Sequence, residues 1–151
     1  MGTPFSTIYD LALVVIRDYR LNHLYENDQD AFNLFMQGLT VKSIPKFTNC
    51  LQKLDYIVES EAEEFEPHFV ATLNNKEIDI MADLVAITWF ETNINDATQV
   101  NLRLQGRDKK TESSASNLKE KSEYFDRLRE KVKQDMNDYL LEDFDPIKNG
   151  W

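Results

Sequence analysis

The sequence predicts a mainly α-helical protein: a small helical bundle with a central buried helix and a long C-terminal helix. The chain of 151 residues contains only four Gly and four Pro, too few for the many tight turns of a hairpin-rich β fold. In several segments apolar residues recur at spacings of three and four, as they do along one face of an α-helix. At this length we expect one domain, which buries roughly 68–70% of its unfolded surface.

The most apolar long segment, residues 73–91, is predicted to form the central helix. Asn74 is a suitable N-cap, and Glu77 stands three residues later, as in a capping box. Apolar residues cover more than half of the circumference of this helix: Ile78, Ile80, Met81, Leu84, Val85, Ile87 and Trp89. Such a helix must be covered by neighbours on several sides.

The N-terminal segment predicts a helix that begins at Pro4 and continues to about Arg20. Thr3 and Pro4 form an N-cap and N1 pair, because proline's missing N–H is no loss in the first turn. The apolar stripe of this helix consists of Phe5, Ile8, Ala12, Val15 and Tyr19. His23 follows the predicted end, and His68 is the only other histidine, so we predict no metal site.

A second helix is predicted from Asn27 or Asp28 to about Ser43, where Pro45 breaks it. The following residues 48–72 are irregular and contain an acidic run: Glu59, Glu61, Glu63, Glu64 and Glu66. Repulsion between these carboxylates favours an exposed, extended loop. The run lacks the spacing of a calcium-binding loop, so we predict no cation site there.

The last predicted element is a long helix from about Thr111 to Glu142. Residues 92–106 before it fit a short strand or a short helix equally well. Apolar residues form one stripe along the long helix: Leu118, Phe125, Leu128, Val132, Met136 and Leu140. A helix of this length spans about 46 Å, more than the width of such a domain, so it either kinks or projects toward a partner. A coiled coil is a weaker alternative, because clean successive heptads are missing.

The chain holds no recognisable set of catalytic or cofactor-binding residues. Two His, one Cys and four Gly provide neither a nucleophile with its base, nor a metal cluster, nor a phosphate loop. We therefore predict that the protein is not an enzyme and has no cofactor. Cys50 cannot form an intramolecular disulfide, and neither a leader nor a membrane span is evident, so we expect synthesis in the cytoplasm.

Charge is distributed unevenly along this acidic chain, whose formal net charge is -10. An acidic surface repels phosphate backbones, so nucleic acid is a poor candidate partner. Residues 107–133 carry more basic than acidic side chains, as either a solvated helix face or a docking surface would. Beyond them, Phe144, Ile147 and Trp151 are large apolar groups in a terminal segment, where they either bind a partner or fold back onto the domain.

Four segments resemble, in order and spacing, the small helical head-tail connector or neck adaptor proteins of tailed bacteriophages. These segments are TPFSTIYDLALVVIRDY, SIPKFTNC, FVATLNNKEIDIMADLVAITWFE and SSASNLKEKSEYFDRLREKVKQDMNDY. The likeness leaves out the acidic run and the C-terminal tail. It implies a helical connector domain over residues 1–142 and a partner-binding tail over residues 143–151.

The resemblance further implies a ring, usually of twelve copies, in the neck of the virion. Its partners would be the portal protein, adjacent copies of the chain and the next neck or tail protein. DNA would pass through the lumen without specific binding, and no membrane would be involved. Phe144, Ile147 and Trp151 would anchor the tail in the portal. Four basic residues would contact the portal or a neighbouring copy: Arg127, Arg129, Lys131 and Lys133.

The alternative is a soluble acidic regulatory or inhibitor protein that binds a basic host protein. The high net negative charge favours this alternative. A regulatory protein of this kind would, however, need neither the long final helix nor the apolar tail. Salt separates the two, because binding through a charged surface weakens steeply as ionic strength rises, and binding through an apolar tail does not.

Overall fold

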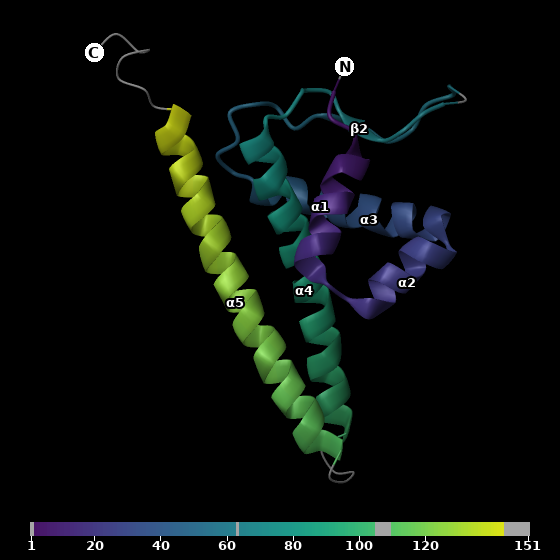
Figure 1. Cartoon of the computed structure of the whole chain (residues 1–151), viewed down its shortest axis with the longest axis vertical. Helices are drawn as coiled ribbons and strands as arrows, with labels where there is room; N and C mark the ends of the chain where they lie inside the picture. Colours follow the sequence, from purple (N-terminus) through teal and green to yellow (C-terminus); the bar gives the residue numbers. More distant parts are fainter. Residues whose placement is uncertain (1, 63, 105–109, 144–151) are drawn as a thin grey trace.

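Helices make up most of the protein, and this confirms the mainly α prediction (Figure 1). The computed structural model describes residues 2–62, 64–104 and 110–143, with only the backbone for 94–104, 110–118 and 142–143. The helices are α1 (Phe5–Ile16), α2 (Tyr19–Asn27), α3 (Gln29–Ser43), the short 3-10 helix η1 (Ile44–Lys46), α4 (Asn75–Leu104) and α5 (Lys110–Asp143). Two short strands, β1 (Tyr56–Ile57) and β2 (His68–Phe69), form an antiparallel ribbon.

The predicted central helix is α4, and its capping box forms as expected. The backbone N–H of Glu77 donates to Asn74 Oδ1, and the N–H of Asn74 donates to Glu77 Oε1, both at 2.8 Å. Residues 81–90 are all buried, because α1, α3 and α5 each pack against this helix. For residues 92–106 the sequence fitted a strand and a helix equally well. The structure continues α4 through this segment as far as Leu104.

The prediction of one helix up to Arg20 is wrong, because the chain turns sharply after Ile16. Arg17 adopts a left-handed conformation with φ of 51°, and its N–H donates to the carbonyl of Leu13. Asp18 Oδ1 then accepts bonds from the N–H groups of Arg20 and Leu21 at 2.8 and 3.2 Å, which starts α2. A side chain that caps a new helix thus ends the old one, although the apolar spacing continues across the break.

Thr3 also differs from its predicted role as the cap of the first helix. Its hydroxyl accepts no hydrogen bond from α1; instead, Thr3 Oγ1 accepts from the N–H of Leu73 at 2.8 Å. The N-terminus continues as an extended segment beside β2, where Pro4 pairs with His68. Thr3 and Pro4 therefore connect the segment just before α4 to the ribbon.

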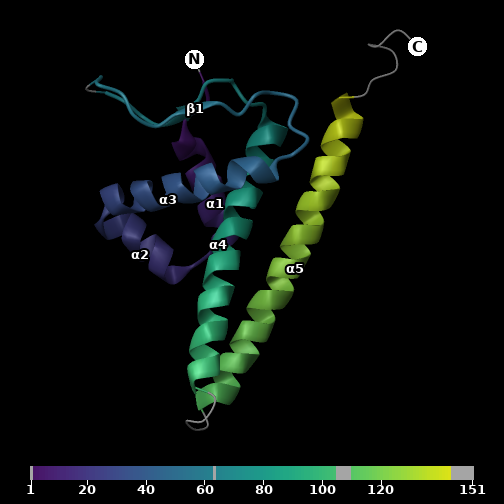
Figure 2. The same ribbon diagram turned by 180° about the vertical axis from the view of Figure 1, so that it is seen from behind.

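The boundaries of α3 agree with the sequence. Asp28 caps it through a bond from the N–H of Ala31 at 3.2 Å, and the helix ends at Ser43 before Pro45. The acidic residues described in the loop after it are all exposed, as predicted: Glu59, Glu61, Glu64 and Glu66. The predicted loop additionally contains the two-stranded ribbon, which extends from the helical body on the side opposite α5 (Figure 2).

The long C-terminal helix confirms the predicted bounds to within one residue at each end. It lies antiparallel to α4, and the two helices extend together beyond α1, α2 and α3 (Figures 1 and 2). Leu128, Val132 and Tyr139 are buried on its inner side, whereas Leu140 from the predicted stripe is 43% exposed. Toward its C-terminal end the axis of α5 diverges from that of α4 (Figure 1), and contacts with residues 49–52 and Glu77 hold this end to the body.

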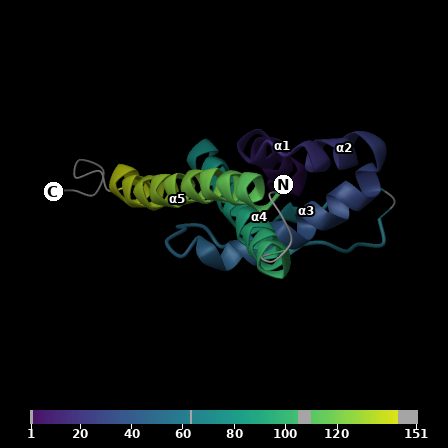
Figure 3. The same ribbon diagram turned by 90° about the horizontal axis from the view of Figure 1, so that it is seen from below.

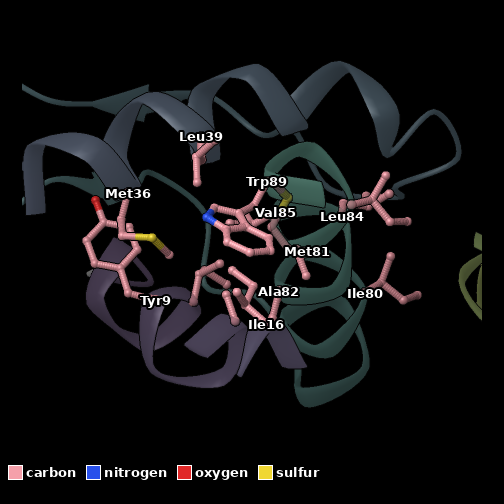
Figure 4. Packing of buried hydrophobic residues seen from close by; sticks show 14 of the residues in the cluster. Tyr9, Ile16, Met36, Leu39, Ile80, Met81, Ala82, Leu84, Val85 and Trp89 are labelled. Atoms are coloured by element: carbon pink, nitrogen blue, oxygen red, sulfur yellow. The ribbon is translucent and has the colours of Figure 1, made fainter. Parts of the chain in front are cut away.

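One hydrophobic core joins α1, α3 and α4. In Figure 4, Ile16 of α1 lies beside side chains of α4, among them Val85 and Trp89, and Tyr9 of α1 lies beside Met36 of α3. Burial of this kind contributes about 1.5–3 kcal/mol for each large apolar side chain, so it dominates the stability of the body. The body therefore provides a rigid support for α5 and the ribbon.

Candidate partner-binding surfaces

The four basic residues predicted to contact partners lie on two sides of α5. Residues four apart share one side of a helix, whereas residues two apart lie roughly 200° from each other. Arg127 therefore shares a side with Lys131, and Arg129 shares the other with Lys133. All four side chains are exposed, and the buried stripe of α5 runs between the two pairs. They form two separate cationic strips.

Lys131 is engaged within the chain. Its Nζ lies 2.8 Å from Asp83 Oδ2 on α4 and 3.1 Å from Asp135 Oδ2 one turn along α5. Burial raises the pKa of Asp83, and the hydrogen bond and charge of Lys131 only partly oppose this rise. The hydrogen bond to Asp83 in turn raises the pKa of Lys131. Lys131 thus links α5 to α4 rather than standing free for a partner.

Replacing Lys131 with Met is expected to lower the free energy of unfolding by about 1–2 kcal/mol at neutral pH. The value is below the 3–5 kcal/mol typical of a broken buried pair because Lys131 itself is largely exposed to water. A carboxyl whose folded pKa is raised gains stability as pH falls through that pKa, so acidification should recover part of the loss. Urea unfolding at neutral and mildly acidic pH measures both effects.

The matched control for this substitution is Lys133→Met. Lys133 Nζ lies 3.8 Å from Glu130 Oε1, and both side chains are largely exposed, so the loss should stay within about 0.5 kcal/mol. Equal losses for the two variants would contradict the structural role assigned to Lys131.

The other basic residues of α5 remain available at the surface. The guanidinium carbon of Arg129 lies 5.4 Å from the ring centroid of Phe125, which holds the side chain against the helix without neutralising it. Within the described part of the chain, no acidic side chain forms an ion pair with Arg127 or Arg129. The exposed contact between Lys133 and Glu130 contributes little.

A buried carboxylate fastens the far end of α5 to the body. Glu77, only 1% exposed, accepts a 2.7 Å hydrogen bond from the hydroxyl of Tyr139 on α5 and another of 2.7 Å from Gln52. The same hydroxyl of Tyr139 accepts from the N–H of Leu51 at 3.0 Å. Asn49 donates to the carbonyl of Met136 at 2.9 Å. Residues 49–52, α4 and α5 are therefore joined by one network.

Neither of the two polar clusters in the core has the properties of a catalytic site. Burial raises the pKa of Cys50, which lies 3.8 Å from Glu77, so its thiol is protonated and poorly nucleophilic at neutral pH. Ser43 Oγ and Thr88 Oγ1 lie 2.7 Å apart, and Lys46 donates to Thr88 at 2.8 Å. A Ser near a Lys can act as a nucleophile, but Ser43 is fully buried and out of reach of a substrate.

Three hollows on the described surface are lined mainly by apolar and charged side chains, and the widest of the three, of about 500 Å³, lies between α1 and the start of α4. One groove of about 180 Å³ lies between α1, α4 and α5 and is lined by Leu11, Asp83 and Lys131, among others. A second, of about 270 Å³, is lined by Trp89, Phe90 and Tyr124. Among the described residues, no group of three His, Cys, Asp or Glu side chains is placed to hold a metal ion. Within the same residues, no helix has the length and apolar content to span a bilayer.

Exposed apolar side chains occur on two different sides of the body. On the outer face of α1, Val14 is 63% exposed, and on the outer face of α3, Leu34 is 71% exposed. Both helices turn their buried faces toward α4, so their outer faces look in different directions (Figure 3). Leu11 and Phe35 lie beside these two residues and are also exposed. The sequence analysis missed both patches, because it considered only the apolar stripes that face the core, and Val14 and Leu34 lie outside those stripes.

The predicted portal anchors Phe144, Ile147 and Trp151 lie outside the described residues. The structure does place the end of α5 at Asp143, from which the tail continues. Their role therefore stays a prediction from the sequence. Comparison of the chain with protein-family models, with curated proteins and with solved structures finds no match.

Proposed function

We propose that this chain is a head-tail connector of a tailed bacteriophage. Copies of it form a ring between the portal and the next neck or tail component, assembled in the host cytoplasm and retained in the virion neck. The proposal is supported by the resemblance of four segments to such adaptors, by the helical fold and by the exposed apolar surfaces. DNA passes through the ring without specific binding.

One observation carries the proposal: two unlike apolar patches stand on different sides of a small helical body. A contact between two unlike surfaces is heterologous, and repeating it generates a ring when the rotation closes. The patch on α3, around Leu34, can pack on the patch on α1, around Val14, of the next copy. Each copy would then use both patches once, which leaves neither exposed.

The shape and charge of the protein also favour a connector. The antiparallel pair of α4 and α5 extends beyond the other helices and gives the protein a long axis (Figure 1). The ends of a protein with such an axis can meet different partners above and below the ring. With a formal net charge of -10, the protein repels a phosphate backbone rather than holding it, so DNA can slide past.

Replacing Leu34 with Asp is expected to convert the ring into monomers without unfolding the chain. A charge at the centre of an apolar contact is desolvated on assembly, which costs several kcal/mol per interface, whereas the free monomer leaves Leu34 in water. Light scattering after size-exclusion chromatography measures the mass, and circular dichroism measures the fold.

The matched control is Asn33→Asp, which adds the same charge to the same exposed stretch of α3 beside the apolar patch. This variant should assemble as the wild type does. A Leu34→Asp protein that still forms the wild-type particle would show that the α3 patch lies outside the interface, and would remove the observation on which the proposal rests.

A further inference from the structure

The ribbon carries an apolar face that the fold leaves uncovered. Phe69 points into the core and is fully buried, so its neighbours His68 and Val70 point to the opposite face, because side chains alternate along a strand. Ile57 pairs with His68 in the ribbon and shares that face. Ile57 is 41% exposed and Val70 is 56% exposed. Two large aliphatic side chains on a short, projecting ribbon form a small contact surface.

Acidic residues at the tip of the ribbon limit what can cover this face. Glu59, Glu61 and Glu64 are exposed and belong to the segment between the two strands, which projects away from the helical body (Figure 1). Two such ribbons would repel each other, so pairing between the ribbon edges of two copies is disfavoured. A suitable occupant therefore combines apolar side chains with positive charge.

One side of α5 has that combination. Phe125, Arg129 and Lys133 follow one another at steps of four, and Leu140 lies seven residues further, so all four share one side of the helix. Arg129 stacks on Phe125, and Leu140 is 43% exposed. The groove between α1 and α5, which contains Lys131, lies on the other side of the helix.

We propose that the face of the ribbon with Ile57 and Val70 docks on the Arg129 and Lys133 side of α5 in a neighbouring copy of this chain. The ribbon and α5 lie on opposite sides of the protein in all three views (Figures 1, 2 and 3). Two copies placed side by side along this direction, in one orientation, thus bring the ribbon of one toward α5 of the other. The proposal rests on the assembly of copies inferred above and gives the acidic run a role in it.

Exchange of charges between two variants tests this contact. In the ribbon variant, Glu61 and Glu64 are both replaced by Lys; in the helix variant, Arg129 and Lys133 are both replaced by Glu. Each variant alone brings like charges together at every interface, and should need about tenfold or more protein to reach half assembly. An equimolar mixture should restore assembly with alternating copies, because each ribbon then meets a helix of opposite charge.

The control variant replaces Glu120 and Glu123 by Lys, which changes the net charge as much as the ribbon variant does but lies elsewhere on α5. It should assemble like the wild type. Sedimentation velocity gives the half-assembly concentration, and native mass spectrometry gives the composition of the mixed particles. Circular dichroism confirms that each variant is folded.

The possible results separate the contact from the ring. If the wild type forms rings and both charge-reversed variants assemble at the wild-type concentration, or if their mixture gains nothing over either alone, the ribbon contact is wrong and the connector still stands. A wild-type chain that stays monomeric even when mixed with portal would instead overturn the ring, and the contact with it.

Discussion

Replacing Glu77 with Ala is expected to lower the free energy of unfolding by about 3 kcal/mol. The substitution removes the acceptor of the buried hydroxyl of Tyr139 and an acceptor of the partly buried Gln52 amide and Asn74 N–H, while Gln52 keeps its bond to the carbonyl of Thr72. A buried donor without a partner costs about 1–3 kcal/mol, and the sum is reduced because a carboxylate no longer has to be dehydrated.

The same substitution should loosen the end of α5 from the body. Tyr139 and Asn49 form the polar contacts described near that end, and Tyr139 is joined to α4 through Glu77. Hydrogen exchange should therefore become faster in residues 136–141 than around Leu128, where packing holds the helix. Uniformly faster exchange along α5 would contradict a local fastening by Glu77.

Two controls accompany the measurement. Tyr139→Phe removes only the hydroxyl and should lower the free energy of unfolding by about 1–2 kcal/mol. Asn137→Ala changes an exposed position of the same helix and should stay within about 0.5 kcal/mol. Urea unfolding must be carried out where all variants have the same mass, because assembly stabilises the folded state. A Glu77→Ala loss below about 1 kcal/mol would contradict the account.

Replacing Phe144, Ile147 and Trp151 together with Ala is expected to abolish binding to the portal. Aromatic and large apolar anchors commonly contribute 2 kcal/mol or more each, so the loss of three should weaken binding by about 1,000-fold or more. Co-sedimentation of the chain with purified portal rings measures the binding. Because the tail follows α5 at Asp143, the fold of the domain should be unchanged.

The control in the tail is Lys148→Ala with Asn149→Ala, which keeps the three anchors. This variant should bind the portal like the wild type. Retained binding of the triple variant would remove the anchor role. A lowered unfolding temperature of the triple variant would show that the tail folds back onto its own domain, the second reading that the sequence left open.

Local signals in the sequence predicted the elements whose bounds depend on nearby residues. Asn74 and Glu77 stand three residues apart, so the capping box and the start of α4 could be predicted. Asp28 and Pro45 marked the ends of α3 in the same way. The break at Arg17 was missed although Asp18 is a good N-cap, because the apolar spacing continues through it.

Long-range pairs could not be predicted. Glu77 was expected only as a cap, and its bond to Tyr139 joins residues 62 apart. Lys131 was assigned to partners, yet it pairs with Asp83, 48 residues away on another helix. The sequence gives the face of a helix on which a residue lies, but which face meets which neighbour depends on the packing of the whole domain.

The mass and image of the protein recovered under native conditions from the lysate in which it is naturally made test the central claim most directly. The connector account predicts a ring, or a virion-sized particle, that contains many copies of the chain in contact with the portal. A small, uniform complex of the chain with a basic host protein, dissociated by moderate salt, would contradict it and favour an acidic regulator instead.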